Sequence, residues 1–301
     1  MTKKHMKARK LLLGVLALSI FSLTACNSVE QEIESSEVEI NLYPVDSISH
    51  VHGLAVDPFE SNKVYLATHK GLFVLIDDVE LFRIGDETDD YMGFLAHPTE
   101  QGVFYTSGHP TNGGNLGIQK SEDGGLSWKT LSNGVNGPVD FHSMTISSVD
   151  TQVLYGWHSG SLQRSLDGGE NWTQLKTSLS NVISLVASTE DAKRVYATTV
   201  AGILVSEDQG ETWTILSNEL NGFAVTHLAI SSERMLAFTE NGLMKSLDKG
   251  STWETLDENF SEDVVIYLAF DPNNIKNAYA FTKNNFLYKS STGGEDWQKI
   301  L

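Results

Sequence analysis

The sequence contains one cysteine, few basic residues and no apolar run long enough for a permanent membrane helix. A single cysteine excludes an internal disulfide, so the folded part must depend on its own apolar core. Lysine and arginine number 21 against 39 aspartate and glutamate residues, which gives a formal net charge of −18. An acidic surface repels phosphate backbones, so nucleic-acid binding is not expected and cationic ligands are favoured.

The first 25 residues have the composition of a secretory signal peptide. Five basic residues precede the apolar run from Leu11 to Phe21, which is too short to span a bilayer. We expect residues 1–25 to be removed on export. Their removal takes away five basic residues and no acidic ones, which leaves a mature chain with a formal charge of −23.

The only cysteine, Cys26, follows Leu23-Thr24-Ala25, and this segment resembles the lipobox of bacterial lipoproteins. The resemblance implies cleavage before Cys26 and a diacylglyceryl group on its thiol. Two acyl chains hold a protein stably on a membrane. We therefore expect an extracytoplasmic protein anchored to a cell membrane. Residues 26–46, rich in glutamate and serine, are predicted to be a flexible tether without order before about Val38.

One eight-residue pattern, Ser-x-Asp-x-Gly-x-x-Trp, recurs five times, at steps of 44, 41, 40 and 44 residues. This spacing is typical of a four-stranded propeller blade. In a tight turn between the third and fourth strands, the aspartate accepts hydrogen bonds from amides and the glycine takes a positive φ. The tryptophan covers apolar space between the sheets. The last copy has Thr292 in place of aspartate. The structural residues of the pattern are Asp123, Asp167, Asp208, Asp248, Trp128, Trp172, Trp213, Trp253 and Trp297.

An apolar first strand and a second strand with an aromatic residue precede each copy of the pattern. A sixth unit of this kind, without the pattern, comes first in the chain. Residues 47–301 are therefore predicted to form an all-β, six-bladed β-propeller of four-stranded antiparallel blades. A seven-bladed propeller is the alternative, but each of its blades would be too short.

The eight-residue pattern resembles the Asp box, or BNR repeat, of sialidases, sortilin-type receptors and photosystem II assembly propellers. From about residue 48 to 301 the chain is similar to bacterial Asp-box lipoproteins that are labelled glycosyl hydrolase-like. This resemblance implies the propeller fold. It does not imply enzymatic activity, because the Asp boxes are structural and carry no catalytic groups. A sialidase needs clustered arginines for its substrate carboxylate. Beyond the signal peptide the arginines are predicted to lie apart, on outer strands or on the opposite face; they are Arg83, Arg164, Arg194 and Arg234.

Histidines are unevenly distributed among the predicted blades. The start of the first strand and the turn after the second strand lie on one face of a propeller. Six of the eight histidines beyond the signal peptide fall at these two positions, all in the first three blades. An uneven distribution of this kind on a repeated fold is typical of a functional site carried by only some of the repeats. The predicted ligand or metal residues are His50, His52, His69, Met92, His109, His142, Met144 and His158.

The residue types leave the ligand open. Histidine with methionine favours copper, whereas histidine with Asp90 or Asp140 suits zinc. The alternatives are a glycoside hydrolase acting on exported or cell-wall glycans, with Asp90, Asp140 and Glu240 as catalytic candidates, and a protein-interaction or assembly propeller. The sequence has no nucleophile motif, phosphate loop or zinc-protease helix motif. We favour a binding or scaffold propeller over an enzyme, with a cationic, glycan or protein ligand.

Overall fold

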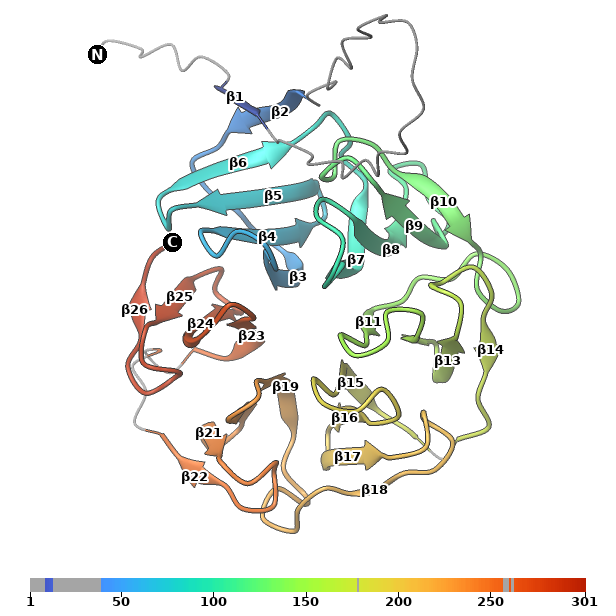
Figure 1. Ribbon diagram of the computed structural model, residues 1–301, viewed down its shortest axis with the longest axis vertical. Coiled ribbons are helices and arrows are strands. Elements are labelled where there is room, and N and C mark those ends of the chain that lie inside the picture. Colours follow the sequence, from blue (N-terminus) through green and yellow to red (C-terminus); the bar gives the residue numbers. More distant parts are fainter. Residues whose placement is uncertain (1–8, 13–38, 178, 257–259, 261–262) are drawn as a thin grey trace, which may run out of the picture.

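The computed structural model describes residues 9–12, 39–177, 179–256, 260 and 263–301. Every regular element among these residues is a β-strand, and the strands form six antiparallel sheets that follow one another along the chain. Figure 1 shows the sheets as six blades arranged in a ring, with the first strand of each blade nearest the centre. The predicted six-bladed β-propeller is confirmed, and the seven-bladed alternative is excluded.

Each blade consists of consecutive strands joined by short turns, which is the simplest way to pair neighbouring segments of one chain. The first three blades contain β3 (Val51–Val56), β4 (Lys63–Thr68), β5 (Gly71–Ile76), β6 (Glu80–Ile84), β7 (Asp90–Ala96), β8 (Phe104–His109), β9 (Ile118–Ser121), β10 (Lys129–Ser132), β11 (Ser143–Ile146), β12 (Leu154–His158), β13 (Ser161–Ser165) and β14 (Thr173–Gln174). The last three contain β15 (Val182–Ala187), β16 (Val195–Thr199), β17 (Gly202–Ser206), β18 (Thr214–Ile215), β19 (Val225–Ile230), β20 (Met235–Thr239), β21 (Gly242–Ser246), β22 (Glu254–Thr255), β23 (Val265–Asp271), β24 (Asn274–Thr282), β25 (Leu287–Ser290) and β26 (Gln298–Lys299).

The first blade carries additional strands at its outer edge. β2 (Glu39–Pro44) pairs with β6, and β1 (Arg9–Leu12), from the predicted signal peptide, pairs with the other edge of β2. Leu42 of β2 is buried in the core between the first two blades. Residues 39–44 therefore belong to a sheet rather than to the predicted tether. Residues 13–38, with Cys26, lie outside the described residues. None of the described segments is a helix that could cross a membrane.

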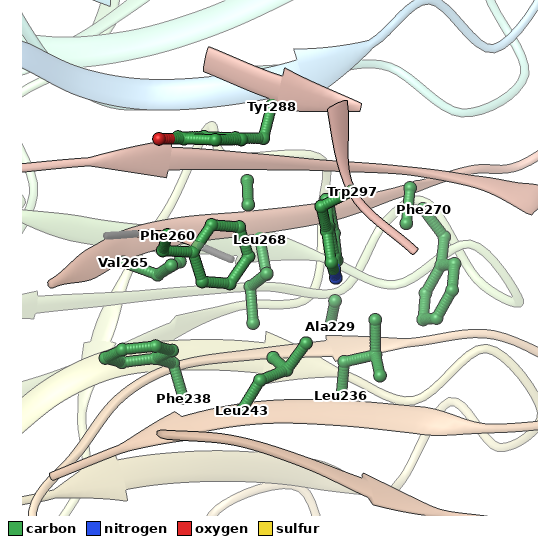
Figure 2. Close-up of a cluster of buried hydrophobic side chains, with 12 residues drawn as sticks. Ala229, Leu236, Phe238, Leu243, Phe260, Val265, Leu268, Phe270, Tyr288 and Trp297 are labelled. Carbon is green, nitrogen blue, oxygen red and sulfur yellow. The ribbon is translucent and has the colours of Figure 1, made fainter. Parts of the chain in front are cut away.

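The core is divided into six apolar clusters, one between each pair of neighbouring blades. Figure 2 shows the cluster between the fifth and sixth blades, where the rings of Trp297 and Phe260 lie 5.3 Å apart between their centroids. Between the sixth and first blades, Phe281 and Leu287 pack with Leu66 and other residues of the first blade. Since no sheet of the described chain combines strands of these two blades, side-chain packing closes the ring.

The eight-residue pattern forms the same turn in every blade that contains it. In the fourth blade, the Ser206 hydroxyl accepts the Gly210 N–H at 2.8 Å, and Asp208 Oδ1 accepts the Thr212 N–H at 2.8 Å. The Thr212 side chain and then its amide, by donating to the carboxylate, lower the pKa of Asp208 to about 2. The Trp213 ring N–H donates to the Gly210 carbonyl at 2.9 Å, which directs the indole between the blades. In this blade the serine, the aspartate and the tryptophan N–H are therefore used by the turn itself, whereas the Trp128 N–H of the second blade is buried without a partner among the described residues.

Candidate functional site

The inner strands surround a central cavity of about 410 Å³. In four blades the inner strand has a β-bulge at the same place, and a bulge turns one side chain out of the regular ladder. The bulged residues are His52, Ile183, Thr226 and Ile266. All four line the cavity, together with His142, which directly precedes β11. At this position of the inner strand, the first and third blades present a histidine to the cavity, whereas the last three blades present an isoleucine or a threonine.

Three polar side chains meet where the first blade contacts the second. Nε2 of His52, on the bulge of β3, lies 2.9 Å from Nε2 of His69, in the turn between β4 and β5. Nδ1 of His69 lies 2.5 Å from Oδ2 of Asp90, at the start of β7. One donor atom from each of the three residues lies within 4.8 Å of the others. We call this group the first triad; the His50 ring stands beside it, 5.2 Å from the His69 ring.

The hydrogen bonds of the first triad fix which nitrogen of His69 carries the proton. Because a carboxylate only accepts, Nδ1 of His69 carries the proton that is donated to Asp90, and Nε2 of the neutral ring keeps a lone pair. This lone pair faces Nε2 of His52. If the proton shared by the two Nε2 atoms is lost, both atoms present lone pairs to the same point. Histidines that bind metals commonly donate their other ring N–H to a carboxylate in this way.

An equivalent group lies one blade further on. Asp140, which is 2% exposed, precedes β11 of the third blade. Its Oδ2 lies 2.9 Å from Nε2 of His109, at the end of β8, and 2.7 Å from Nε2 of His142. We call His109, Asp140 and His142 the second triad; one donor atom from each again lies within 4.8 Å of the others. His158 donates from Nδ1 to the main-chain carbonyl of Asp140 at 2.6 Å and stays outside the triad.

Both ring nitrogens of His109 face hydrogen-bond acceptors. Nδ1 lies 2.8 Å from the Gly114 carbonyl oxygen, and Nε2 faces the Asp140 carboxylate. A neutral imidazole has one donor and one acceptor nitrogen, so it satisfies only one of these contacts. A backbone carbonyl on the outer nitrogen is a common second partner of a metal-binding histidine.

The ionisation of the two triads differs. Burial, and then the neighbouring His69, lowers the pKa of His52, which favours the neutral form of this ring. The hydrogen bond to Asp140 raises the pKa of His142. Burial opposes ionisation of Asp140, but the hydrogen bond from His142 and the neighbouring histidines lower its pKa overall. The second triad therefore contains an ionised, almost fully buried carboxylate.

The two triads adjoin through the second blade. Asp90 of the first triad and His109 of the second are directly paired residues on β7 and β8. Oδ1 of Asp90 and Oδ1 of Asp140 are both buried and have no hydrogen-bond partner among the described residues. A buried carboxylate oxygen without a partner is costly, and a cation is one way to satisfy it.

The two methionines predicted for this site do not join the triads. In the second blade the bulge falls after Met92, so Met92 stays in the ladder opposite Ser107 and is 7% exposed. Met144 touches the cavity but is buried in the core between the second and third blades. The combination of histidine and methionine that favoured copper is therefore absent from both triads.

The remaining candidates lie elsewhere. Glu240 is exposed in the turn between β20 and β21 of the fifth blade, away from both aspartates. Arg164, Arg194 and Arg234 form ion pairs with three different glutamates. Arg194 and Arg234 nevertheless line one small pocket, so the predicted separation is wrong for these two. Arg83 donates to the Gly85 carbonyl.

Two contacts of the site have no signal in the sequence. The Gly114 carbonyl orients His109 from within an irregular loop, and Asn285 of the sixth blade accepts the main-chain N–H of His50 at 3.1 Å. Both depend on where loops lie in space, and neither residue type indicates a ligand-binding role.

Comparisons with known proteins agree with this architecture. No model of a known protein family matches the chain. The photosystem II assembly lipoprotein Ycf48 of Synechococcus sp. (strain CC9902) is 31% identical over 125 residues, which cover 40% of this chain and 36% of that protein. Thus the match spans about a third of that relative's length.

Solved structures resemble the chain over most of its length. The GH74 enzyme of Niastella koreensis superposes with a TM-score of 0.60 at 18% identity, over 86% of this chain and 46% of that one. YCF48 from Cyanidioschyzon merolae superposes with a TM-score of 0.54 at 13% identity, over 83% of this chain and 98% of that one. At such low identity the likeness concerns the fold alone, and the chain is a β-propeller similar to those of GH74 enzymes and Ycf48.

Proposed function

We propose that this protein is an exported, lipid-anchored propeller that binds divalent metal ions, above all zinc, at its first and second triads. The observation that carries the proposal is the second triad. There a buried carboxylate and two histidine nitrogens converge within 4.8 Å, and one of these histidines already donates its outer N–H to a backbone carbonyl. Nitrogen and carboxylate donors in this combination suit zinc.

The absence of sulfur from both triads separates zinc from the reduced form of copper. Cu(I) prefers thiolate and thioether ligands, whereas imidazole and carboxylate suit a divalent ion. Both methionines of this region are at most 7% exposed and belong to strands packed in the core. The acidic surface of the mature chain also raises the local concentration of cations. Zinc is therefore the ion with which the site should be tested first.

Zinc titration of the purified mature protein tests this proposal. We expect two zinc ions per chain in the wild type and one in each of the variants His52→Ala and His109→Ala, because each variant removes a nitrogen donor from a different triad. Elemental analysis after gel filtration gives the stoichiometry. Glu240→Gln is the matched control, since it changes an exposed acidic residue in the fifth blade, and it should retain two ions. A wild-type protein without zinc would sink the proposal.

The membrane location rests on Cys26 and its resemblance to a lipobox, supported by the matching relative, which is named a lipoprotein. The five turns of the eight-residue pattern, read as Asp boxes, are structural in this proposal. Cell fractionation tests the anchor: the wild type should sediment with membranes, and Cys26→Ser should move most of the protein to the soluble fraction. Equal distribution of the two proteins would contradict lipidation.

A glycoside hydrolase has less support from the same geometry. Asp90 and Asp140 are each held by histidines, and Glu240 lies in another blade, so these three candidates do not form a pair of free carboxylates at one substrate position. An assembly or scaffold role is compatible with metal binding, and the local similarity to the assembly lipoprotein Ycf48 favours it as the second candidate.

A further inference from the structure

The central cavity is divided into two chemically different halves. His52 and His142 face it from the first and third blades, whereas Ile183 and Ile266 occupy the equivalent positions of the fourth and sixth. Leu185, Leu228, Leu268 and Phe270 line the same space. None of the described residues that line this cavity is a lysine, arginine, aspartate or glutamate.

The one titratable ring on the apolar side is uncharged at neutral pH. Burial lowers the pKa of His227 to about 4, and its Nδ1 accepts the main-chain N–H of Leu268 at 3.2 Å. The walls contributed by the last three blades are therefore neutral. Such walls favour an apolar ligand group over a hydrated one.

Zinc would make the opposite side of the cavity positive. The triads contribute two carboxylates, so two divalent ions leave a surplus of about two positive charges. The second triad offers three protein donors, and a zinc ion with three protein ligands keeps an open position for a further one. In the first triad Asp90 Oδ2 accepts the His69 Nδ1–H, so an ion held there by the two Nε2 atoms has open positions as well. Because His52 and His142 line the cavity, an exogenous ligand in that space can reach the ions.

We propose that the metal-loaded cavity binds a small amphipathic carboxylate, with its carboxylate on the zinc ions and its alkyl chain along Ile183 and Ile266. This inference rests on the proposed zinc function and adds the class of ligand. The volume of about 410 Å³ is that of a pocket for a small organic molecule. The acidic surface elsewhere excludes large polyanions but not a single carboxylate.

Isothermal titration of zinc-loaded protein with acetate, hexanoate and octanoate tests the inference. Because each buried methylene contributes about 0.8 kcal/mol, affinity should rise about fourfold per methylene and about 15-fold from hexanoate to octanoate. Treatment with a chelator should abolish octanoate binding, and octanol, which lacks the carboxylate, should bind at least 10-fold more weakly than octanoate.

A pair of matched variants tests whether octanoate binds in the cavity or on the outer surface. Ile183→Ser, at a residue that is 39% exposed and lines the cavity, should weaken octanoate binding about 10-fold and leave zinc stoichiometry at the wild-type value. Ile215→Ser changes an isoleucine 50% exposed on the outer strand of the same blade and should change neither.

The outcomes distinguish the two proposals. If zinc binds but octanoate binds no more tightly than acetate, the amphipathic ligand is wrong and the metal function stands. If zinc itself does not bind, both fail. If octanoate binds equally well to the chelated protein, the alkyl chain has a site of its own and the metal-linked carboxylate is wrong.

Discussion

Replacing Asp140 with alanine is expected to lower zinc affinity at the second triad by about 100-fold or more, because the variant removes the only anionic donor of that triad. The Nε2 atoms of His109 and His142 lie 2.9 and 2.7 Å from Oδ2 of Asp140, so both rings lose the carboxylate that holds them together. The first triad has its own carboxylate, so its affinity should change little. Competition with a chromophoric zinc chelator resolves the two affinities.

Thermal unfolding gives an independent measure of the Asp140 variant. An ion that binds only the folded state at 100 times its Kd adds about 2.7 kcal/mol, so the wild type should gain two such increments and Asp140→Ala only one. Asp263→Ala is the matched control. Asp263 is a buried carboxylate before the inner strand of the sixth blade, but it accepts main-chain N–H groups and has no histidine partner in the described part of the chain. This control should lose stability and keep both zinc increments; loss of an increment there would mean that the assay reports folding rather than coordination.

The uneven histidines could be recognised in the sequence because repeats make equivalent positions visible. Aligning the blades placed His52 and His142 at one position and His69 at another, and both positions lie on one face as expected. The sequence indicates Asp90 and Asp140 as partners, but which histidine meets which aspartate could not be predicted, because His69 contacts Asp90 of the next blade, and His109 likewise contacts Asp140. Contacts between blades depend on the rotation from one sheet to the next, which a linear pattern does not specify.

Two differences between the predicted and observed structures have local causes. Met92 aligns with His52 in sequence, but the bulge in its strand falls one step later, and a shift of one residue turns a side chain to the other face of a sheet. Glu39–Pro44 has too short an apolar alternation to be recognised as a strand, and it becomes one by pairing with the exposed edge of β6. Both outcomes depend on the partner strand.

Phe281→Ala is expected to lower the free energy of unfolding by about 3–5 kcal/mol, because it removes a fully buried ring from the cluster that joins the last blade to the first. The site should respond unevenly. Asn285, which follows β24 in the same blade, accepts the main-chain N–H of His50 beside the first triad. Loosening this junction should therefore weaken zinc at the first triad several-fold and leave the second triad unchanged.

Phe238→Ala separates this effect from a general loss of stability. Phe238 is 6% exposed and packs in the cluster between the fifth and sixth blades, which contacts neither triad. Urea denaturation should show a comparable loss for the two variants, while zinc competition should show a weakened first triad only in Phe281→Ala. Equal weakening of zinc binding at both triads in Phe281→Ala would mean that the substitution loosens the whole propeller rather than the junction between the last and first blades. Selective weakening of the first triad would show that closure of the propeller by side-chain packing, rather than by an exchanged strand, positions the histidines beside that junction.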